Sequence, residues 1–302
     1  MKKQDVNKKD IKNYWEAKAP QTWYSNKNPE TNTLSYFNEI AYQRYNVYYS
    51  FIPSIAEFEF HPGEKVLDIG VGLGTDIVSY AKNGAIVSGV DLTENAIEVT
   101  KSHLELFNLK AEKLVVADAE NLPFDDNYFD VVYSFGVLHH TPNTEKAIAE
   151  ALRVLKPGGK VIVMLYARGW KHYFKRLFIS GILRGQLFKF GYDKTVSKNT
   201  EVKGNSPLTY VFKKKEIKKI FENAQSVNIS IKRYRLGEFF DYAPYNTIRL
   251  PGFITKIFYF LGLEGIMGEN YIIKAFKVDE NFKSPTPKFS AWQIITNNHL
   301  KF

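Results

Sequence analysis

Short apolar runs alternate with amphipathic segments through the middle of the chain. Five runs, at residues 65–69, 85–90, 113–117, 129–134 and 160–166, are rich in strand-forming residues such as Val and Ile. Three intervening segments, at residues 75–82, 93–107 and 143–155, carry apolar residues at helical spacing. Strands that alternate with helices in this way predict right-handed βαβ units and a mainly parallel sheet.

The segments on either side of this alternation have different patterns. Residues 1–60 look helical and are crowded with aromatic residues, which recur at helical spacing between positions 34 and 49. After residue 166 the chain becomes basic and aromatic, and we expect Gly181, Gly185 and Gly204 to break any long element there.

The pattern resumes near the C-terminus with a predicted basic helix at 213–223 and predicted strands at 227–234 and 271–278. We therefore expect four regions along the chain. They are an N-terminal helical aromatic cap (1–60), a cofactor-binding core (61–166), a basic substrate or lid region that completes the sheet (167–278) and a C-terminal tail (279–302).

A glycine-rich turn follows the first predicted strand. Residues 66–76 read Val-Leu-Asp-Ile-Gly-Val-Gly-Leu-Gly-Thr-Asp, so three glycines stand between a strand and a helix start. Glycine has no Cβ and tolerates positive φ, so the backbone can come close to a ligand, and the new helix presents unpaired N–H groups there. The turn predicts a site for a nucleotide-type cofactor.

Acidic residues end the next two predicted strands. Asp91 stands seventeen residues after Gly74, where a carboxylate can accept hydrogen bonds from a ribose diol. Asp118 and Ala119 end the third strand, where an acceptor can take the exocyclic amine of adenine. Thr75 stands where the dinucleotide fingerprint has glycine or alanine, which disfavours NAD, and no lysine-containing phosphate loop is present. Together these positions predict an adenosine-containing cofactor.

With these motifs the chain resembles the class I S-adenosylmethionine-dependent methyltransferases, close to the group called methyltransferase type 11. The resemblance rests on residues 66–76, 90–91, 118–120 and 129–166, and it covers roughly residues 60–166. It implies a Rossmann-like α/β fold with a doubly wound seven-stranded sheet, mostly parallel with the last strand antiparallel. It also implies S-adenosyl-L-methionine as methyl donor and S-adenosyl-L-homocysteine as product.

The resemblance further implies which residues hold the cofactor. Asp68 and the glycines would hold its methionine part and ribose, Asp91 would bind the ribose hydroxyls, and Leu92 would pack on adenine. The implied cofactor-binding residues are Asp68, Gly70, Gly72, Gly74, Thr75, Asp91, Leu92, Asp118, Ala119, Ser134, Phe135 and Gly136.

Methyl transfer from a sulfonium is an in-line displacement, so the protein mainly has to align donor and acceptor, which can supply about 7–11 kcal/mol. An acceptor hydroxyl also needs a base, and His139 and His140 follow the fourth strand, where the acceptor should approach. Placement in the aromatic cap, after the fifth strand or in the lid suggests further acceptor contacts. The candidate substrate-binding residues are Tyr14, Tyr24, Tyr36, Tyr166, Tyr173, Tyr210 and Arg249.

Composition excludes some chemistry. The chain has no cysteine, which removes disulfides, cysteine-ligated metal sites and cysteine nucleophiles, and we expect no metal. Its charged N-terminus has no apolar run behind it, and Lys256 and Glu264 interrupt the apolar run at 250–267. We therefore expect a cytoplasmic protein.

The basic character belongs to the C-terminal part, since residues 61–166 hold 9 basic and 15 acidic residues and residues 167–302 hold 24 and 10. This asymmetry is compatible with a solvated lysine-rich face or with contact to a membrane, a lipid or RNA. Ser134-Phe135-Gly136-Val137 replaces the tetrapeptide of nucleic-acid amine methyltransferases, which disfavours nucleic acid. We expect a small-molecule acceptor that is a natural product, lipid-like or anionic.

Two other functions stay open. The same fold can use the sulfonium in another reaction, such as an intramolecular cyclisation. Alternatively, the chain could be an RNA-associated methyltransferase or a non-catalytic binding module. The number of subunits is left open by the sequence.

Overall fold

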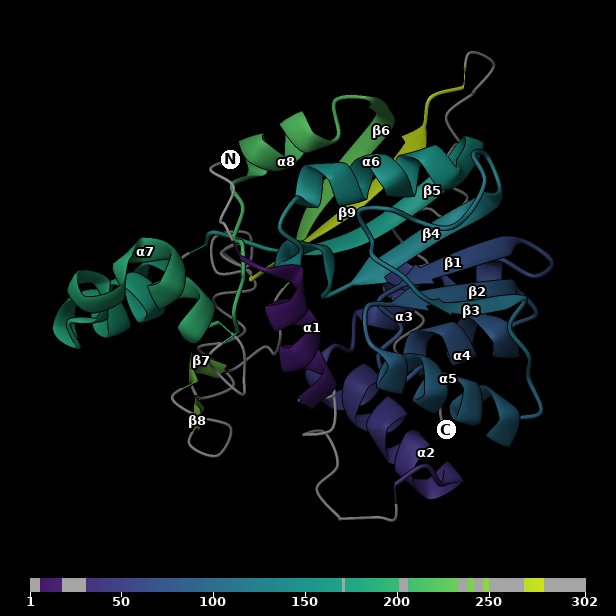
Figure 1. The fold of residues 1–302 in the computed structure, drawn as a ribbon, viewed down its shortest axis with the longest axis horizontal. Coiled ribbons are helices and arrows are strands. Elements are labelled where there is room, and N and C mark those ends of the chain that lie inside the picture. Colours follow the sequence, from purple (N-terminus) through teal and green to yellow (C-terminus); the bar gives the residue numbers. More distant parts are fainter. Residues whose placement is uncertain are drawn as a thin grey trace.

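A seven-stranded sheet with helices on both faces forms the body of the protein (Figure 1). The computed structural model describes residues 6–17, 31–169, 172–200, 206–232, 238–241, 247–249 and 269–279. The strands of this sheet are β1 (Lys65–Ile69), β2 (Ile86–Asp91), β3 (Lys113–Val116), β4 (Phe129–Phe135), β5 (Leu155–Tyr166), β6 (Ala224–Lys232) and β9 (Asn270–Lys277).

The strands lie in the order β3-β2-β1-β4-β5-β9-β6. The pairs from β3 to β5 are parallel, whereas β9 runs antiparallel to both of its neighbours, β5 and β6. This arrangement confirms the predicted fold class, including the antiparallel last strand. A separate two-stranded sheet pairs β7 (Glu238–Asp241) with β8 (Thr247–Arg249).

Helices α6 and α8 cover one face of the sheet, and α4 and α5 cover the other (Figure 1). Helix α1 crosses near the edge where the parallel strands end, and α7 stands away from the sheet. The α-helices are α1 (Lys8–Ala17), α2 (Leu34–Tyr42), α3 (Ile52–Ala56), α4 (Thr75–Lys82), α5 (Glu94–Leu106), α6 (Thr144–Val154), α7 (Gln186–Lys198) and α8 (Lys214–Ile220). Two π-helices, η2 (Gln43–Tyr48) and η5 (His172–Leu183), and two short 3-10 helices, η3 (Phe58–Phe60) and η4 (Leu138–His140), complete the set in the described chain.

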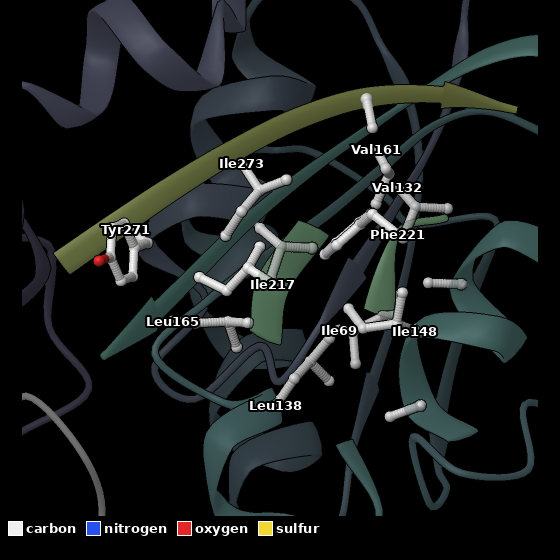
Figure 2. Close-up of a cluster of buried hydrophobic side chains, with 14 of the residues drawn as sticks. Ile69, Val132, Leu138, Ile148, Val161, Leu165, Ile217, Phe221, Tyr271 and Ile273 are labelled. Atoms are coloured by element: carbon white, nitrogen blue, oxygen red, sulfur yellow. The ribbon is translucent and has the colours of Figure 1, made fainter. Parts of the chain in front are cut away.

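Alternate residues of each central strand enter different apolar layers because strand side chains point to opposite faces. In β4, Val132 joins the layer under α6 and α8, while Val131 and Tyr133 join the layer under α3 and α4. Figure 2 shows the first layer, where Ile148 of α6 and Ile217 and Phe221 from the α8 region meet the strand side chains.

The structure differs from the sequence prediction after β5. We expected glycines to prevent long elements between residues 167 and 212, yet η5 is twelve residues long, whereas α7 is interrupted by a kink at Gly191, which has a φ of +74°. Gly185, at a φ of +66°, does separate them, but Gly181 lies inside η5, so the expectation was wrong there. A Cβ on Gly181 would make only ordinary van der Waals contact with Leu187, at 3.4 Å. Gly204 lies outside the described residues.

No helix among the described residues is both long and apolar enough to cross a lipid bilayer.

Shortening a side chain in the layer of Figure 2 should destabilise the whole domain. Ile148 is fully buried, so Ile148→Ala removes apolar contacts and leaves a cavity, which should lower the free energy of unfolding by about 2–5 kcal/mol. Urea denaturation followed by circular dichroism measures this change. Lys146→Ala, on the exposed side of the same helix, is the matched control and should change stability by less than about 0.5 kcal/mol; an equal loss in both variants would contradict the assigned packing.

Candidate functional site

A cavity of about 170 Å³ lies at the edge of the sheet where the parallel strands end. Residues at or just after the ends of β1 to β5 line its floor, and residues of α1 and η2 line the other side. The lining residues are Lys8, Ile11, Trp15, Arg44, Tyr49, Ile69, Gly70, Gly72, Val90, Asp91, Leu92, Thr93, Ala117, Asp118, Ala119, Phe135, Gly136, Val137, His140, Thr141, Pro142, Met164 and Tyr166.

The glycine turn after β1 brings bare backbone to this cavity. Gly70, Gly72 and Gly74 all have positive φ, at +86°, +55° and +76°. A Cβ at Gly70 would lie 2.2 Å from a methyl group of Val137, in the segment after β4, so a side chain there would need both a strained backbone and a displaced neighbour. The glycine at position 70 therefore allows the turn after β1 to pack directly against the segment after β4.

Asp91 lies at the end of β2 and fixes the shape of the same turn. One carboxylate oxygen accepts a hydrogen bond from the N–H of Gly72 at 3.2 Å, and the other accepts from the N–H and hydroxyl of Thr93 at 3.0 and 2.8 Å. Burial raises the pKa of Asp91, although the bonds from Thr93 and Gly72 oppose this shift. The Asp91 carboxylate lines the cavity, and hydrogen bonds to each of its two oxygens fix its orientation.

An acidic pair after β3 is closed over by the N-terminal helix. Lys8 of α1 forms ion pairs with Asp118 and, at 2.8 Å, with Glu120. Glu120 also accepts from the N–H of Asn143 at 2.7 Å and from the hydroxyl of Thr141, so it connects α1 to the start of α6. Asp118 itself accepts from the N–H of Glu120. Lys8 therefore adds a positive charge to the cavity beside Asp118.

A buried ion pair connects the π-helix η2 to the start of α4. Arg44 is 3% exposed and forms two hydrogen bonds with the carboxylate of Asp76, which also accepts from the hydroxyls of Tyr45 and Tyr133 at 2.7 and 3.0 Å. The guanidinium also lies 5.0 Å from the ring centre of Phe135, in cation–π contact. The carboxylate of Asp76 thus accepts hydrogen bonds from three side chains, and this network fixes the position of Arg44 in the cavity wall.

The two adjacent histidines have different environments. His140 lines the cavity, its Nδ1 donates to the backbone oxygen of Leu208 at 2.8 Å, and its ring lies 5.0 Å from the ring of Trp15. His139 is fully buried behind Tyr166, with ring centres 3.9 Å apart. Burial lowers the pKa of His139 well below its ordinary value, and His140 and Arg176 nearby lower it further. His140 is thus the histidine that the fold brings to the cavity.

The predicted cofactor residues divide into those on the cavity surface and those behind it. Lining it are Gly70, Gly72, Asp91, Leu92, Asp118, Ala119, Phe135 and Gly136. Asp68, Gly74, Thr75 and Ser134 do not line it. Ser134 instead donates to the backbone oxygen of Ile69, which ties β4 to β1, and Gly74 packs against Thr100. Asp68 is buried, and burial, followed by the nearby charge of Asp76, raises its pKa well above the ordinary value.

Of the predicted acceptor contacts whose side chains the structure describes, only Tyr166 lines this cavity. Tyr36 packs in an apolar cluster with Phe37, Ile40 and Leu73, so the structure does not bring it to the site. Three other predicted tyrosines do not line the cavity either. Tyr14 packs edge-on against Trp15, and Tyr173 is exposed on η5. The Tyr210 hydroxyl donates a hydrogen bond to the backbone oxygen of Pro142. Tyr24 and the side chain of Arg249 lie outside the described residues.

Sequence reasoning missed most of the residues that close the cavity from α1 and η2. Trp15 and Tyr49 belonged to the aromatic N-terminal segment, but no periodicity distinguished them from packing residues. Lys8 and Arg44 gave no signal, because their partners are 110 and 32 residues away in the chain. No group of three or more potential metal-binding side chains occurs among the described residues.

The donor set of this cavity fits the adenosine and sulfonium parts of S-adenosylmethionine. The backbone of Gly70 and Gly72 lines the cavity, Asp91 offers an acceptor for ribose hydroxyls, and Leu92 offers an apolar surface for a base. Among the described residues that line the cavity, the basic ones are Lys8, Arg44 and His140. Lys8 and Arg44 form ion pairs with carboxylates, so the described lining does not resemble a phosphate-binding site.

Comparisons with known proteins agree with this geometry. Residues 67–163 match a family model described as a methyltransferase domain. The chain is 37% identical over 113 residues to phosphoethanolamine N-methyltransferase 2 of Caenorhabditis elegans, covering 37% of this chain and 26% of that protein. It is 38% identical over 122 residues to the ubiquinone/menaquinone biosynthesis C-methyltransferase UbiE of Cupriavidus metallidurans, covering 39% of this chain and 49% of that protein. The matches therefore span about half or less of the length of these relatives.

A solved structure of similar fold is phosphoethanolamine N-methyltransferase 2 of Haemonchus contortus, in complex with phosphomonomethylethanolamine and S-adenosylhomocysteine. It superposes with a TM-score of 0.56 at 19% identity and covers 89% of this chain and 61% of that chain. At this identity the likeness concerns the fold. Fold, motif order and family match together lead to one conclusion: residues 67–163 form a class I S-adenosylmethionine-dependent methyltransferase domain of the type 11 group.

Proposed function

We propose that this protein transfers a methyl group from S-adenosylmethionine to a small-molecule acceptor that enters beside His140 and Tyr166. The observation that carries the proposal is one cavity lined both by the strand ends suited to adenosine and by a histidine with a defined ring orientation. The curated relatives support a small-molecule acceptor, since their names refer to phosphoethanolamine and to ubiquinone and menaquinone biosynthesis.

The residues of the floor would bind and orient the donor. Asp91 would accept hydrogen bonds from the ribose hydroxyls, Leu92 would pack on adenine, and Asp118 with Ala119 would receive its amine. Phe135 and Gly136 would lie beside the sulfonium, where the face of an aromatic ring favours a cation. The bound donor supplies an already activated methyl group, so alignment and exclusion of water are the main tasks of the protein.

His140 would act as the general base when the acceptor is a hydroxyl. The backbone oxygen of Leu208 can only accept a hydrogen bond, so the neutral ring carries its proton on Nδ1 and its lone pair on Nε2. Thr209 Oγ1 lies 3.3 Å from the same Nδ1 and helps to keep that orientation. A fixed tautomer with its basic nitrogen defined is what proton removal during methyl transfer requires.

A cluster of positive charge behind Tyr166 supports an acceptor with an anionic group. Arg176 is 6% exposed and forms no hydrogen bond or ion pair with another described residue. Its charge helps to lower the pKa of His139, and burial, Arg176 and Arg168 together lower the pKa of His172 to about 3. No described residue supplies a counter-charge to this buried guanidinium, and a nearby anion would offset the cost of burying it. We therefore favour an anionic or amphipathic acceptor over a neutral one.

The proposed reaction can be tested without knowing the acceptor. The protein is incubated with S-adenosylmethionine carrying a labelled methyl group and with small-molecule and lipid extracts, and products are separated on an anion-exchange resin. We expect labelled product together with S-adenosylhomocysteine, mainly in the resin-retained fraction. Methylthioadenosine in place of S-adenosylhomocysteine would indicate cyclisation, and a bound cofactor without turnover would indicate a binding module; either result overturns the proposal.

Removing the Asp91 carboxylate should weaken cofactor binding strongly. Asp91→Ala removes the expected acceptor for the ribose hydroxyls and the bond to Gly72 N–H that shapes the turn, so affinity for S-adenosylhomocysteine should fall by about tenfold to a hundredfold. Isothermal titration calorimetry measures the change. Asp125→Ala, at an exposed position away from the cavity, is the control, and unchanged affinity in Asp91→Ala would count against the assigned cofactor site.

Replacing His140 should slow methyl transfer and leave donor binding nearly intact. Loss of a general base lowers turnover by about a hundredfold to ten-thousandfold, whereas the donor contacts are made by other residues. Turnover of His140→Ala is measured with and without added imidazole, with calorimetry of S-adenosylhomocysteine as the check on folding. Rescue by imidazole is expected; wild-type turnover in the variant would contradict a role as base.

A further inference from the structure

We propose that the hairpin formed by η5 and α7 docks on an anionic lipid bilayer and inserts the apolar side chains of its tip. The tip is the turn around Gly185, from Ile182 to Lys189. This inference goes beyond the proposed methyl transfer, since it concerns a surface outside the cavity.

Large apolar side chains are concentrated on this hairpin. Thirteen are exposed in the described chain, and six of these lie between residues 172 and 200: Tyr173, Phe178, Ile182, Leu183, Phe188 and Tyr192. Three are within seven residues at the tip, where Ile182 is 50%, Leu183 66% and Phe188 81% exposed. Isolated exposed apolar residues are normal on a soluble protein, but a group of this kind marks an interaction surface.

Basic side chains lie on the same hairpin as the apolar group. Residues 172–200 contain six basic residues and one acidic residue, Asp193. Lys189, Lys194 and Lys198 all lie near the ring of Phe190, at 5.3, 5.9 and 4.1 Å from its centre. Exposed apolar residues next to clustered lysines are the chemistry that binds the interface of anionic membranes, because apolar groups enter the acyl boundary while lysines meet the headgroups.

The base of the hairpin is held firmly, although its tip is exposed. His172, Arg176 and Ser180 of η5 and Thr195, Val196 and Ser197 of α7 are buried. Tyr192 and His172 join the two helices through a hydrogen bond of 3.1 Å, and Ser197 accepts from the N–H of Thr209 at 2.9 Å. In Figure 1 the helix α7 stands away from the sheet, so a flat surface can reach this end of the molecule.

The hairpin base also contacts the segment that orients His140. Leu208 accepts the hydrogen bond from His140, and the next residue, Thr209, donates to Ser197 of α7. Two hydrogen bonds, from Thr209 to Ser197 and from His140 to Leu208, would therefore link a hairpin docked on a bilayer to the cavity near His140.

Other partners fit this surface less well. Two copies of the hairpin would bring together surfaces with the same excess of positive charge, which repel. Nucleic acid would match the lysines but would leave Ile182, Leu183 and Phe188 in water. An anionic bilayer satisfies both the charge and the apolar group.

Vesicle sedimentation tests the proposal. The full chain is mixed with vesicles of phosphatidylcholine alone or of phosphatidylcholine with about one third phosphatidylglycerol, and the sedimented fraction is measured at low and high salt. We expect binding to the anionic vesicles that weakens with salt. Leu183→Ser combined with Phe188→Ser should reduce the partition coefficient by at least about tenfold, because both side chains lose their apolar contact.

The matched control is Leu106→Ser combined with Val116→Ser, two exposed apolar residues outside the hairpin, which should bind as the wild type does. Affinity for S-adenosylhomocysteine should be unchanged in every variant, so the result is independent of the catalytic proposal. Equal binding of the tip variant and the wild type, or no binding to anionic vesicles, overturns the proposal. A concentration-dependent dimer abolished by the tip variant would assign the surface to a second copy instead.

A second measurement does not depend on removing side chains. The chain has no cysteine, so Leu183→Cys carries a single polarity-sensitive fluorophore at the tip, and Leu106→Cys carries it at the control position. Anionic vesicles should shift the emission to shorter wavelength only for the label at position 183. Absence of a shift there, or an equal shift at both positions, contradicts insertion of the tip.

Discussion

The candidate site depends on the parallel pairing of β1 with β2 on one side and with β4 on the other. Parallel strands that share a register end at the same edge, so the turn after β1, Asp91 after β2 and the segment after β4 must meet there. The backbone at Gly70 lies so close to Val137 that no side chain fits between them. One register therefore positions the glycine turn after β1 beside the segment after β4.

Charge pairing then closes the cavity from the N-terminal helices. The sheet region is acidic, and Lys8 and Arg44 from α1 and η2 meet its carboxylates at Asp118, Glu120 and Asp76. The pair between Arg44 and Asp76 is buried and has further hydrogen bonds from two tyrosines, so its desolvation is compensated by geometry. Residues of α1 and η2 thus form part of the cavity wall.

The region around His140, where we propose that the acceptor enters, combines buried His and Arg side chains with an exposed apolar surface. His140 has its tautomer set by Leu208, while His139, His172 and Arg176 are buried behind it. The same region continues into η5 and α7, whose tip carries Ile182, Leu183 and Phe188. An anionic, amphipathic acceptor and a lipid surface are compatible with this combination, and they connect the two proposals physically.

The sequence by itself determined the class of fold, the strands and helices between residues 65 and 166 and the residues of the glycine turn, since these follow from local periodicity and from glycine between a strand and a helix. It also predicted that Asp91 and Asp118 stand at strand ends, and both residues line the cavity. Only the tertiary structure separated His140 from His139, removed Tyr36 from the site and brought in Lys8, Trp15 and Arg44. These placements depend on contacts between residues that are far apart in the sequence. A local sequence pattern does not show which side of a helix will face the cavity.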